Sequence, residues 1–304
     1  MAFEITFLGT GAASPTLSRG LSAAVINVDE TLCLIDCGEG TQMQMLRFGI
    51  KKDRIRHVFI SHLHGDHYFG LVGLLFTWHL HQRKDELHIW GPFTLKEILE
   101  IQIKTSVPNL CYPLIFHDLE SLPDGVICIE KRFTVSKFPL NHRLSTFGFL
   151  VKETGRQGNI SKDFIEKYHP DPETIRKIKE GSDYKTNEGI IIPHTDIVTP
   201  VRLHSFAWCS DTAYHPPVIE YVTDADVLYH EATFTKDMQW LAEEKGHSTT
   251  IDAALIAAQA KVHHLILGHI SQRYSDMDEF VNEAKSIFPH TDVAYDGMRI
   301  KLRN

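Results

Sequence analysis

The chain contains few cysteines, and none of them forms a CxxC pair. Its 304 residues include five, an odd number at scattered positions: Cys33, Cys37, Cys111, Cys128 and Cys209. This pattern excludes a disulfide framework of the kind that stabilises small secreted proteins, and it excludes a zinc site built from thiolates. We therefore expect a protein of a reducing compartment, the cytoplasm.

The chain also lacks a long apolar run and an excess of positive charge. No stretch approaches the roughly 20 residues that a membrane span requires. The first residues alternate apolar and polar and include Glu4, which does not fit a signal peptide, so we expect neither secretion nor a membrane partner. A net charge of −8, from 31 basic and 39 acidic residues, argues against indiscriminate binding to nucleic acid, and no DNA partner is expected. A local basic groove remains compatible with this charge.

Apolar periodicity predicts strands and helices in both halves of the chain. Strands are expected at 4–8, 23–28, 31–36, 58–60, 87–90, 126–133, 147–151, 227–230, 264–267 and 299–302, and helices at 40–48, 69–82, 94–105, 249–260 and 277–287. Hairpins combined with αβ units favour an α/β (α+β) fold, a four-layer αββα sandwich in which two sheets pack face to face between outer helices. No repeat or linker divides the chain, so residues 1–304 are expected to form a single domain.

Two segments carry more specific expectations. The helix at 40–48 is expected to turn Met43, Leu46 and Phe48 toward the core. The stretch 152–185 is charged, contains glycine and proline, and has only a short apolar pattern, which indicates an inserted, partly helical arm. Because its charges nearly balance, its residues alone fit a solvated excursion as well as an arm that grips a substrate.

Histidine is concentrated in one short segment. His62, His64, Asp66 and His67 lie within six positions, directly after the apolar run 58–60. Alternation along an extended chain places His62 and His64 on the same side, while the other two donors lie on the following turn. Imidazole and carboxylate without thiolate suit zinc, with manganese and iron as alternatives. The segment therefore predicts a metal site rather than a strand end with solvated histidines.

Four donors cannot complete the coordination of two ions, so further ligands are expected at the ends of other strands. His142, Asp211 and His269 each lie just past an apolar, strand-like run. With a carboxylate between the two ions, the first two histidines of the cluster and His142 would hold one ion. Asp66, His67 and His269 would hold the other.

HLHGDH with these later histidine and aspartate residues resembles the metallo-β-lactamase superfamily, and the surrounding sequence resembles the ribonuclease Z family over most of the chain. FLGTGAASPT and DCGEGTQMQML resemble its N-terminal segments, and GHISQRY resembles its last ligand block. HEATF at 230–234 and HST at 247–249 match two motifs that are characteristic of the family. HLHGDH alone identifies only the superfamily, whereas HEAT and HST at this spacing are much more specific.

The resemblance implies a metallo-β-lactamase fold and endonucleolytic removal of the 3′ trailer from precursor tRNA, leaving a 3′-hydroxyl. It implies two Zn²⁺ ions per chain, and the length resembles the short, homodimeric form of the enzyme. Two such ions can bind a phosphate oxygen, lower the pKa of a bridging water and stabilise the leaving oxygen. Asp66 is then a metal ligand that also orients the water or accepts its proton.

Expulsion of the ribose oxygen requires a proton donor opposite the attacking water, and His247 is the candidate acid. The HEAT and HST motifs imply that Glu231 is its partner, since a carboxylate fixes the imidazole tautomer and raises its pKa. The alternative for His247 is an exposed residue that precedes the helix at 249–260. His230 is expected to pack or support rather than to ligate. Arg273 is a candidate substrate contact, with an internal salt bridge as the alternative.

The sequence departs from the family in two places. The arm lacks a clear glycine- and proline-rich tip and is not strongly basic, so its contact with tRNA is open. The early loop PTLSRGLSA differs from the bacterial pattern on both sides of its arginine, which leaves open how precursors that carry CCA are treated. A basic cluster is either a contact for the RNA backbone or a solvated face: Arg47, Lys51, Lys52, Arg54 and Arg56.

Two other functions stay open at this point. An enzyme of the same fold that acts on a small phosphodiester, thioester or sulfate ester would suit the acidic net charge. A catalytically silent RNA-binding or scaffold subunit would be expected to have lost at least one of the seven candidate ligands, and this chain retains them all.

Overall fold

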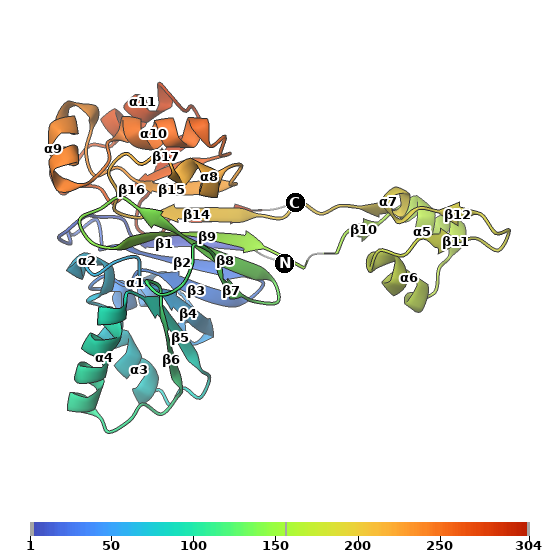
Figure 1. Ribbon diagram of the computed structural model, residues 1–304, viewed down its shortest axis with the longest axis horizontal. Coiled ribbons are helices and arrows are strands. Elements are labelled where there is room, and N and C mark those ends of the chain that lie inside the picture. The colour runs from blue at the N-terminus through green and yellow to red at the C-terminus, as the bar shows by residue number, and fades with distance from the viewer. Residues whose placement is uncertain (1–2, 156, 303–304) are drawn as a thin grey trace.

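A computed structural model of the protein describes residues 3–155 and 157–302. The ends of the expected domain, 1–2 and 303–304, and residue 156 of the expected arm lie outside the described residues. Within these ranges, two sheets of seven strands each pack face to face between outer helices (Figure 1). The four-layer αββα sandwich expected from the sequence is confirmed.

The first sheet is formed by the N-terminal part of the chain and by its last strand, in the order β18-β1-β2-β3-β4-β5-β6. Its strands are β1 (Phe3–Gly9), β2 (Ala23–Val28), β3 (Thr31–Ile35), β4 (Ile55–Phe59), β5 (Leu87–Gly91), β6 (Leu114–Asp118) and β18 (Arg299–Leu302). Strands β3 to β6 run parallel, and the remaining pairs are antiparallel. The helical elements of this half are α1 (Thr41–Arg47), the 3₁₀ turn η1 (Lys52–Arg54), α2 (Gly65–Tyr68), α3 (Leu71–Leu80) and α4 (Phe93–Ser106).

The second sheet has the order β17-β16-β15-β14-β9-β8-β7. Its strands are β7 (Gly125–Ile129), β8 (Phe133–Leu140), β9 (Thr146–Glu153), β14 (Ser205–Cys209), β15 (Val227–Glu231), β16 (Leu265–Gly268) and β17 (Thr291–Val293). Its helical elements are α8 (Val218–Val222), η2 (Lys236–Met238), α9 (Gln239–Lys245), α10 (Thr250–Gln259) and α11 (Asp278–Lys285). Among the described residues, no helix has the length and apolar character needed to cross a membrane.

The main core lies between the two sheets and is rich in aromatic side chains. Phe7 of β1 stacks on Tyr229 of β15, and Phe59 of β4 packs against Phe149 of β9. The opposite faces of the central strands are also buried, under α3 and α4 on one side and under α8, α10 and α11 on the other. Strands that are buried on both faces read as continuous apolar runs, which is why these segments were recognisable in the sequence.

One predicted strand is wrong in its bounds. The run 126–133 is two strands, because the chain turns after Ile129 and starts again at Phe133 as β8. Strand β8 had not been predicted as a separate strand. It contains Pro139, a residue that weakens a strand pattern, and a buried Lys137 whose ammonium group pairs with Asp124 at 2.8 Å.

The expected orientation of the helix at 40–48 is also wrong. In α1, Thr41 and Met45 face the protein core, whereas Met43 and Leu46 are 67% and 63% exposed. The hydroxyl of Thr41 donates to the carbonyl oxygen of Gly38, and Met45 lies on the same face because residues four apart share a face of a helix. Only Phe48, just after the helix, packs partly against the core as expected.

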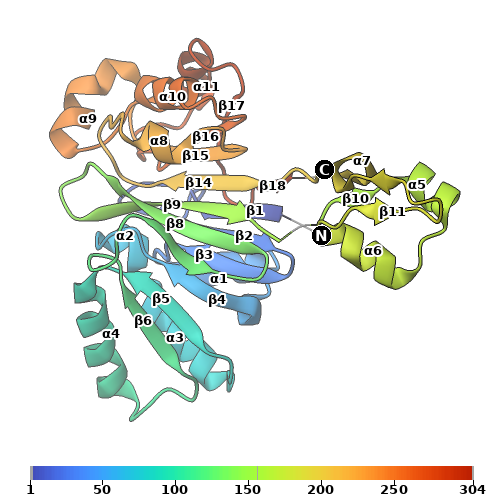
Figure 2. The same ribbon diagram turned by 45° about the vertical axis from the view of Figure 1, so that its right-hand side comes forward.

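The arm leaves the sandwich between β9 and β14, and both views show it projecting well away from the two sheets (Figures 1 and 2). It contains β10 (Asn159–Ile160), α5 (Lys162–Tyr168), α6 (Pro172–Lys179), β11 (Tyr184–Lys185), β12 (Ile191–Ile192), α7 (His194–Ile197) and β13 (Val198–Thr199). Phe164, Ile178, Ile197 and Val198 form a small core within it. Strand β10 pairs with β13, so the projecting unit continues past 185, where the predicted arm ended.

Candidate metal centre

The predicted ligands meet at one end of the sandwich, where strands from both sheets end. In one half, His62 and His64 follow β4, and Asp66 and His67 belong to α2. In the other half, His142 follows β8, Asp211 follows β14 and His269 follows β16. Local packing fixes the last of these loops. A Cβ atom on Gly268 would lie 2.1 Å from Cε2 of Tyr229, so only glycine allows β16 to end against that ring.

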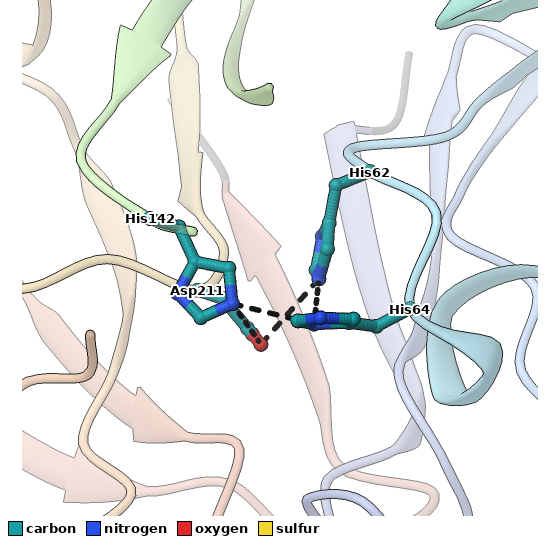
Figure 3. Close-up of side chains that lie close together, drawn as sticks. All are labelled: His62, His64, His142 and Asp211. Carbon is teal, nitrogen blue, oxygen red and sulfur yellow. Dashed lines mark hydrogen bonds and ion pairs between the residues drawn. The ribbon is translucent and has the colours of Figure 1, made fainter. Parts of the chain in front are cut away.

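Four of these side chains form one group of converging donors (Figure 3). Nδ1 of His64 lies 3.0 Å from Nε2 of His62 and 3.3 Å from Nε2 of His142. Oδ2 of Asp211 lies 3.5 Å from Nε2 of His62 and 3.8 Å from Nε2 of His142. Four ligand atoms at these separations can surround a single ion.

The other oxygen of Asp211 faces a second group, formed by Asp66, His67 and His269. Its Oδ1 lies 3.4 Å from Nε2 of His67 and 3.3 Å from Nε2 of His269. Oδ2 of Asp66 lies 3.6 Å and 3.3 Å from the same two nitrogens. The grouping is the one expected from the sequence, with Asp211 as the carboxylate between the two groups.

The charges in the centre fit a divalent cation. Among the described residues, Nε2 of His67 and Oδ1 of Asp211 are buried and have no hydrogen-bond partner. Burial lowers the pKa of His67, but the carboxylates of Asp211 and Asp36 outweigh burial and raise that pKa well above its ordinary value. The same two carboxylates favour a metal cation at this position, which takes the place of the proton on the ring. A donor set of histidine and aspartate without cysteine suits zinc and similar metals.

Most of the ligand imidazoles are held through their Nδ1 atoms, which turns Nε2 toward the centre. Nδ1 of His67 lies 2.8 Å from Oδ2 of Asp36, and Nδ1 of His269 lies 2.9 Å from Oγ1 of Thr233. Nδ1 of His142 donates to the carbonyl oxygen of Gly246 at 2.7 Å. Such outer contacts fix the tautomer and orientation of a metal-ligating histidine.

Two of these supporting residues were missed in the sequence. Asp36 belongs to the segment DCGEG and Thr233 to the segment HEATF, and both segments had been noted only for their resemblance. Asp36 stands directly after strand β3, the same position after a strand that identified His142, Asp211 and His269. Applying the same rule there would have found it.

His247 lies beside the two groups and forms a pair with Glu231. Its Nδ1 is 2.7 Å from Oε1 of Glu231, a fully buried carboxylate that also accepts from the backbone N–H groups of Thr212 and Thr233. Burial lowers the pKa of His247, but the charge and the hydrogen bond of Glu231 outweigh it and raise the pKa to about 9. His247 is therefore protonated at neutral pH and able to donate a proton.

The other sequence-derived candidates lie outside this cluster. His230 is buried, and its Nδ1 lies 2.7 Å from the carbonyl oxygen of Glu231, so it packs as expected. Arg273 is exposed at the rim, and no ion pair of its side chain occurs within the described part of the chain. Arg54 of the basic cluster pairs with Glu30. The basic cluster does not line the cavity over the centre.

The centre opens into a cavity of about 800 Å³. Arg143, Lys245 and Arg273 contribute positive charge to its lining, and Phe69 and Phe234 contribute aromatic rings. The three cations and the exposed ring of Phe69 suit a substrate that carries phosphates and bases that can stack.

Comparisons with known proteins agree with this geometry. A family model described as anti-Pycsar protein Apyc1 matches residues 3–147. A ribonuclease Z of Bacteroides thetaiotaomicron is 40% identical over 303 residues, which cover 99% of this chain and 96% of that protein.

Two solved structures show the same architecture. The short form of human tRNase Z superposes with a TM-score of 0.72 at 28% identity, over 98% of each chain. YhfI of Bacillus subtilis, described as a metallo-β-lactamase fold protein, superposes with a TM-score of 0.71 at 18% identity, over 99% of this chain and 100% of that one. The second likeness supports the fold alone.

Proposed function

The chain belongs to the ribonuclease Z family, and we propose that it is an endoribonuclease that removes the 3′ trailer from precursor tRNA. Its sandwich is the metallo-β-lactamase fold. The observation that carries the proposal is the carboxylate of Asp211, whose two oxygens face separate groups of converging donors. That arrangement suits a hydrolase that uses two cations on one phosphodiester.

The centre is a divalent-metal site, and we propose two zinc ions per chain. One would be held by Nε2 of His62 and His142, Nδ1 of His64 and Oδ2 of Asp211. The other would be held by the second group and Oδ1 of Asp211. When bound, such a pair lowers the pKa of an attacking water and neutralises charge on the phosphate.

We propose that Asp66 is a metal ligand that also orients the attacking water or accepts its proton. Burial raises its pKa, but the bond to His269 and the charges of His67 and His269 outweigh burial and lower it well below its usual range. The backbone N–H of Ala13 donates to Oδ2 of Asp66 at 2.8 Å and holds the carboxylate in place. Asp66 is therefore ionised at neutral pH, so its oxygens can ligate a cation and accept a hydrogen bond from the water.

His247 is the proton donor for the leaving group in this proposal. As water adds to phosphorus, the bond from phosphorus to the ribose O3′ breaks. The O3′ takes the proton held by His247, which leaves the tRNA with a 3′-hydroxyl and the trailer with a 5′-phosphate. Glu231 accepts the Nδ1 proton of His247 and stabilises the protonated ring, so the proton that is transferred is the one on Nε2.

We propose that the basic lining of the cavity and the projecting arm bind the RNA backbone. In the last turn of α6, Arg176 and Lys177 form ion pairs with Glu180 and Glu173 of the same helix, and Lys179 adds a third cation. Local cations can bind RNA although the net charge of the chain is negative. Affinity for RNA depends on the surface patch that meets the phosphates rather than on the sum of the charges over the chain.

We further propose a homodimer and a cytoplasmic location. Large apolar side chains are exposed on α1 (Met43 and Leu46), on the turn between α2 and α3 (Phe69) and at the end of α3 (Leu80). The two helices are adjacent, since the hydroxyl of Thr77 donates to Oε1 of Gln42 at 3.0 Å. Exposed apolar side chains that gather on one surface mark an interaction site, and a second copy would cover them. All five cysteines are free, as a reducing compartment allows.

The test is to incubate the zinc-loaded protein with a precursor tRNA that carries a 3′ trailer and to map the new ends. We expect cleavage at the trailer with a 3′-hydroxyl on the tRNA, and loss of that cleavage in Asp66→Ala. A parallel assay on bis(p-nitrophenyl) phosphate separates the alternative function. Robust hydrolysis of the small ester without cleavage of the precursor would overturn the proposal.

A further inference from the structure

Ser61 lies at the centre of a buried hydrogen-bond network behind the metal ligands. Its hydroxyl oxygen is 3.1 Å from Oδ2 of Asp36, 3.1 Å from Nδ1 of His62 and 3.1 Å from Oγ of Ser210. The side chains of Ser61 and Ser210 are buried. Neither serine hydroxyl belongs to the two donor groups. Any effect of Ser61 or Ser210 on the metal must therefore pass through a neighbouring residue.

The direction of each bond in this network follows from counting protons. The Asp36 carboxylate can only accept, and it receives the Ser22 hydroxyl, the Ser61 hydroxyl and the Ser61 backbone N–H at 2.8 to 3.1 Å. Because the single hydroxyl proton of Ser61 points to Asp36, its oxygen must accept from His62 and from Ser210 at 3.1 Å. Nδ1 of His67 is also 3.5 Å away, but its proton goes to Asp36 at 2.8 Å. His62 therefore carries its proton on Nδ1, and Ser210 donates to Ser61.

This assignment leaves Nε2 of His62 unprotonated and aimed at the donor group. Asp36 sets the tautomer of His67 directly, at 2.8 Å, and sets that of His62 through the hydroxyl of Ser61. A hydroxyl also lies between a carboxylate and a ligand histidine in the second half of the centre. Thr233 donates to Oε2 of Glu231 and receives Nδ1 of His269, each at 2.9 Å.

Ser210 adds a connection between the two sheets. Ser61 lies just beyond β4 of the first sheet, and Ser210 lies between β14 of the second sheet and the bridging Asp211. A backbone bond from Phe147 N–H to the carbonyl oxygen of Ser61, at 3.0 Å, joins the sheets at the same place. The hydroxyl bond thus ties the segment that carries HLHGDH to the segment that carries Asp211.

We propose that Ser61 and Ser210 are positioning residues that carry the tautomer control of Asp36 to His62 and hold that imidazole in register with Asp211. The inference rests on the metal site of the proposed function. Supporting partners of this kind typically contribute tenfold to a hundredfold to metal affinity.

The test compares Ser61→Ala, Ser210→Ala and the double variant in full-length protein. Metal affinity is measured with Zn²⁺ by chelator competition, and coordination is followed by the visible absorption of protein loaded with Co²⁺. We expect each single variant to bind zinc about tenfold to a hundredfold more weakly and to show an altered Co²⁺ spectrum. Because both hydroxyls act through one bond, the double variant should lose less than the product of the two single losses.

Ser205→Ala is the matched control, because Ser205 is a buried serine at the other end of β14 whose hydroxyl contacts Asp226. It should lower thermal stability without changing zinc affinity or the spectrum. If Ser61→Ala does not fold, Ser210→Ala carries the test alone. Unchanged affinity and spectrum in Ser210→Ala, or losses that multiply in the double variant, overturn the inference. A wild-type protein that binds no ion would instead overturn the metal site itself.

Discussion

Histidines in the centre differ in the charge that their neighbours impose on them. Burial lowers the pKa of His142, which favours the neutral ring that a metal ligand needs. The same burial acts on His247, but Glu231 outweighs it and raises the pKa to about 9. Two imidazoles whose ring centroids are 5.1 Å apart are thus set for different roles, one as a ligand and one as an acid.

At this scale we predict that His247→Ala slows cleavage of precursor tRNA by about a hundredfold to ten-thousandfold, the usual contribution of a general acid. Zinc content should stay at the wild-type level, because His247 lies outside the two donor groups that hold the ions in our proposal. The measurement is single-turnover cleavage together with metal analysis. In the wild type the rate should fall as pH rises through about 9, where His247 loses its proton. Near-normal turnover in the variant would contradict the role.

Strands β4, β5 and β6 bring three further histidines together away from the metal centre. His57 and His88 are partners in register, and Nδ1 of His88 lies 2.9 Å from Nε2 of His117. The ring of His117 stacks on Trp90, with centroids 3.7 Å apart. Burial, and then the nearby His88 and His57, lower the pKa of His117 to about 4. The surroundings of His117 therefore favour its neutral ring.

At the element scale, this cluster should make stability depend on pH. The folded pKa of His117 lies below the unfolded value of about 6.5, so its contribution is complete above that value and is lost as pH falls toward 4. His117→Phe keeps a ring on Trp90 and removes the titration. Urea unfolding at pH 7.5 and pH 5 should show a smaller loss of stability in the variant than in the wild type.

The control for this measurement is His169→Asn, which changes an exposed histidine in the arm at a left-handed position that asparagine tolerates. It should leave the pH dependence unchanged. Equal losses of stability in His117→Phe and the wild type would show that His117 takes no part.

The whole molecule separates the place of chemistry from a projecting unit. The arm projects away from the two sheets (Figure 2). The cavity over the metal centre is lined by residues of the sandwich, whereas the arm has its own small core. A unit whose apolar side chains pack among themselves can be removed with little loss to the main core. The arm therefore offers a test of substrate capture that does not disturb the site.

We predict that replacing residues 157–200 with a short glycine-serine linker leaves hydrolysis of bis(p-nitrophenyl) phosphate unchanged. The KM of this variant for precursor tRNA should rise on the order of tenfold or more while kcat changes little, because binding contacts remote from the reacting bond are lost. Steady-state kinetics on both substrates measures this. An unchanged KM for the precursor would show that the arm does not contact it.

Self-association is the second prediction at this scale. Leu46→Glu places a charge on the exposed apolar surface of α1 and should convert a dimer into a monomer in sedimentation experiments, because burying an unpaired charge is unfavourable. Ile101→Glu changes an apolar residue of α4 that is similarly exposed and should leave the dimer intact. A wild-type protein that sediments as a monomer would contradict the proposed dimer.

Local patterns in the sequence determined much of this molecule. Strands 23–28 and 299–302 were predicted with the bounds that the structure has, and the helix at 249–260 differs from α10 by one residue at each end. The donor groups could also be recognised in the sequence. Each donor follows a buried apolar run, and imidazole together with carboxylate is a typical set of metal ligands. Periodicity and residue type act over a few positions, so a single sequence carries them.

Only the tertiary structure decided which faces are covered and which distant side chains meet. In α1, the polar Thr41 and Gln44 bond inward while Met43 and Leu46 face outward, an arrangement that no apolar pattern reveals. The bond between Ser61 and Ser210 joins residues 149 positions apart and exists because two sheets pack in one register. Contacts of that kind depend on how whole elements are placed against each other, and local sequence does not encode that placement.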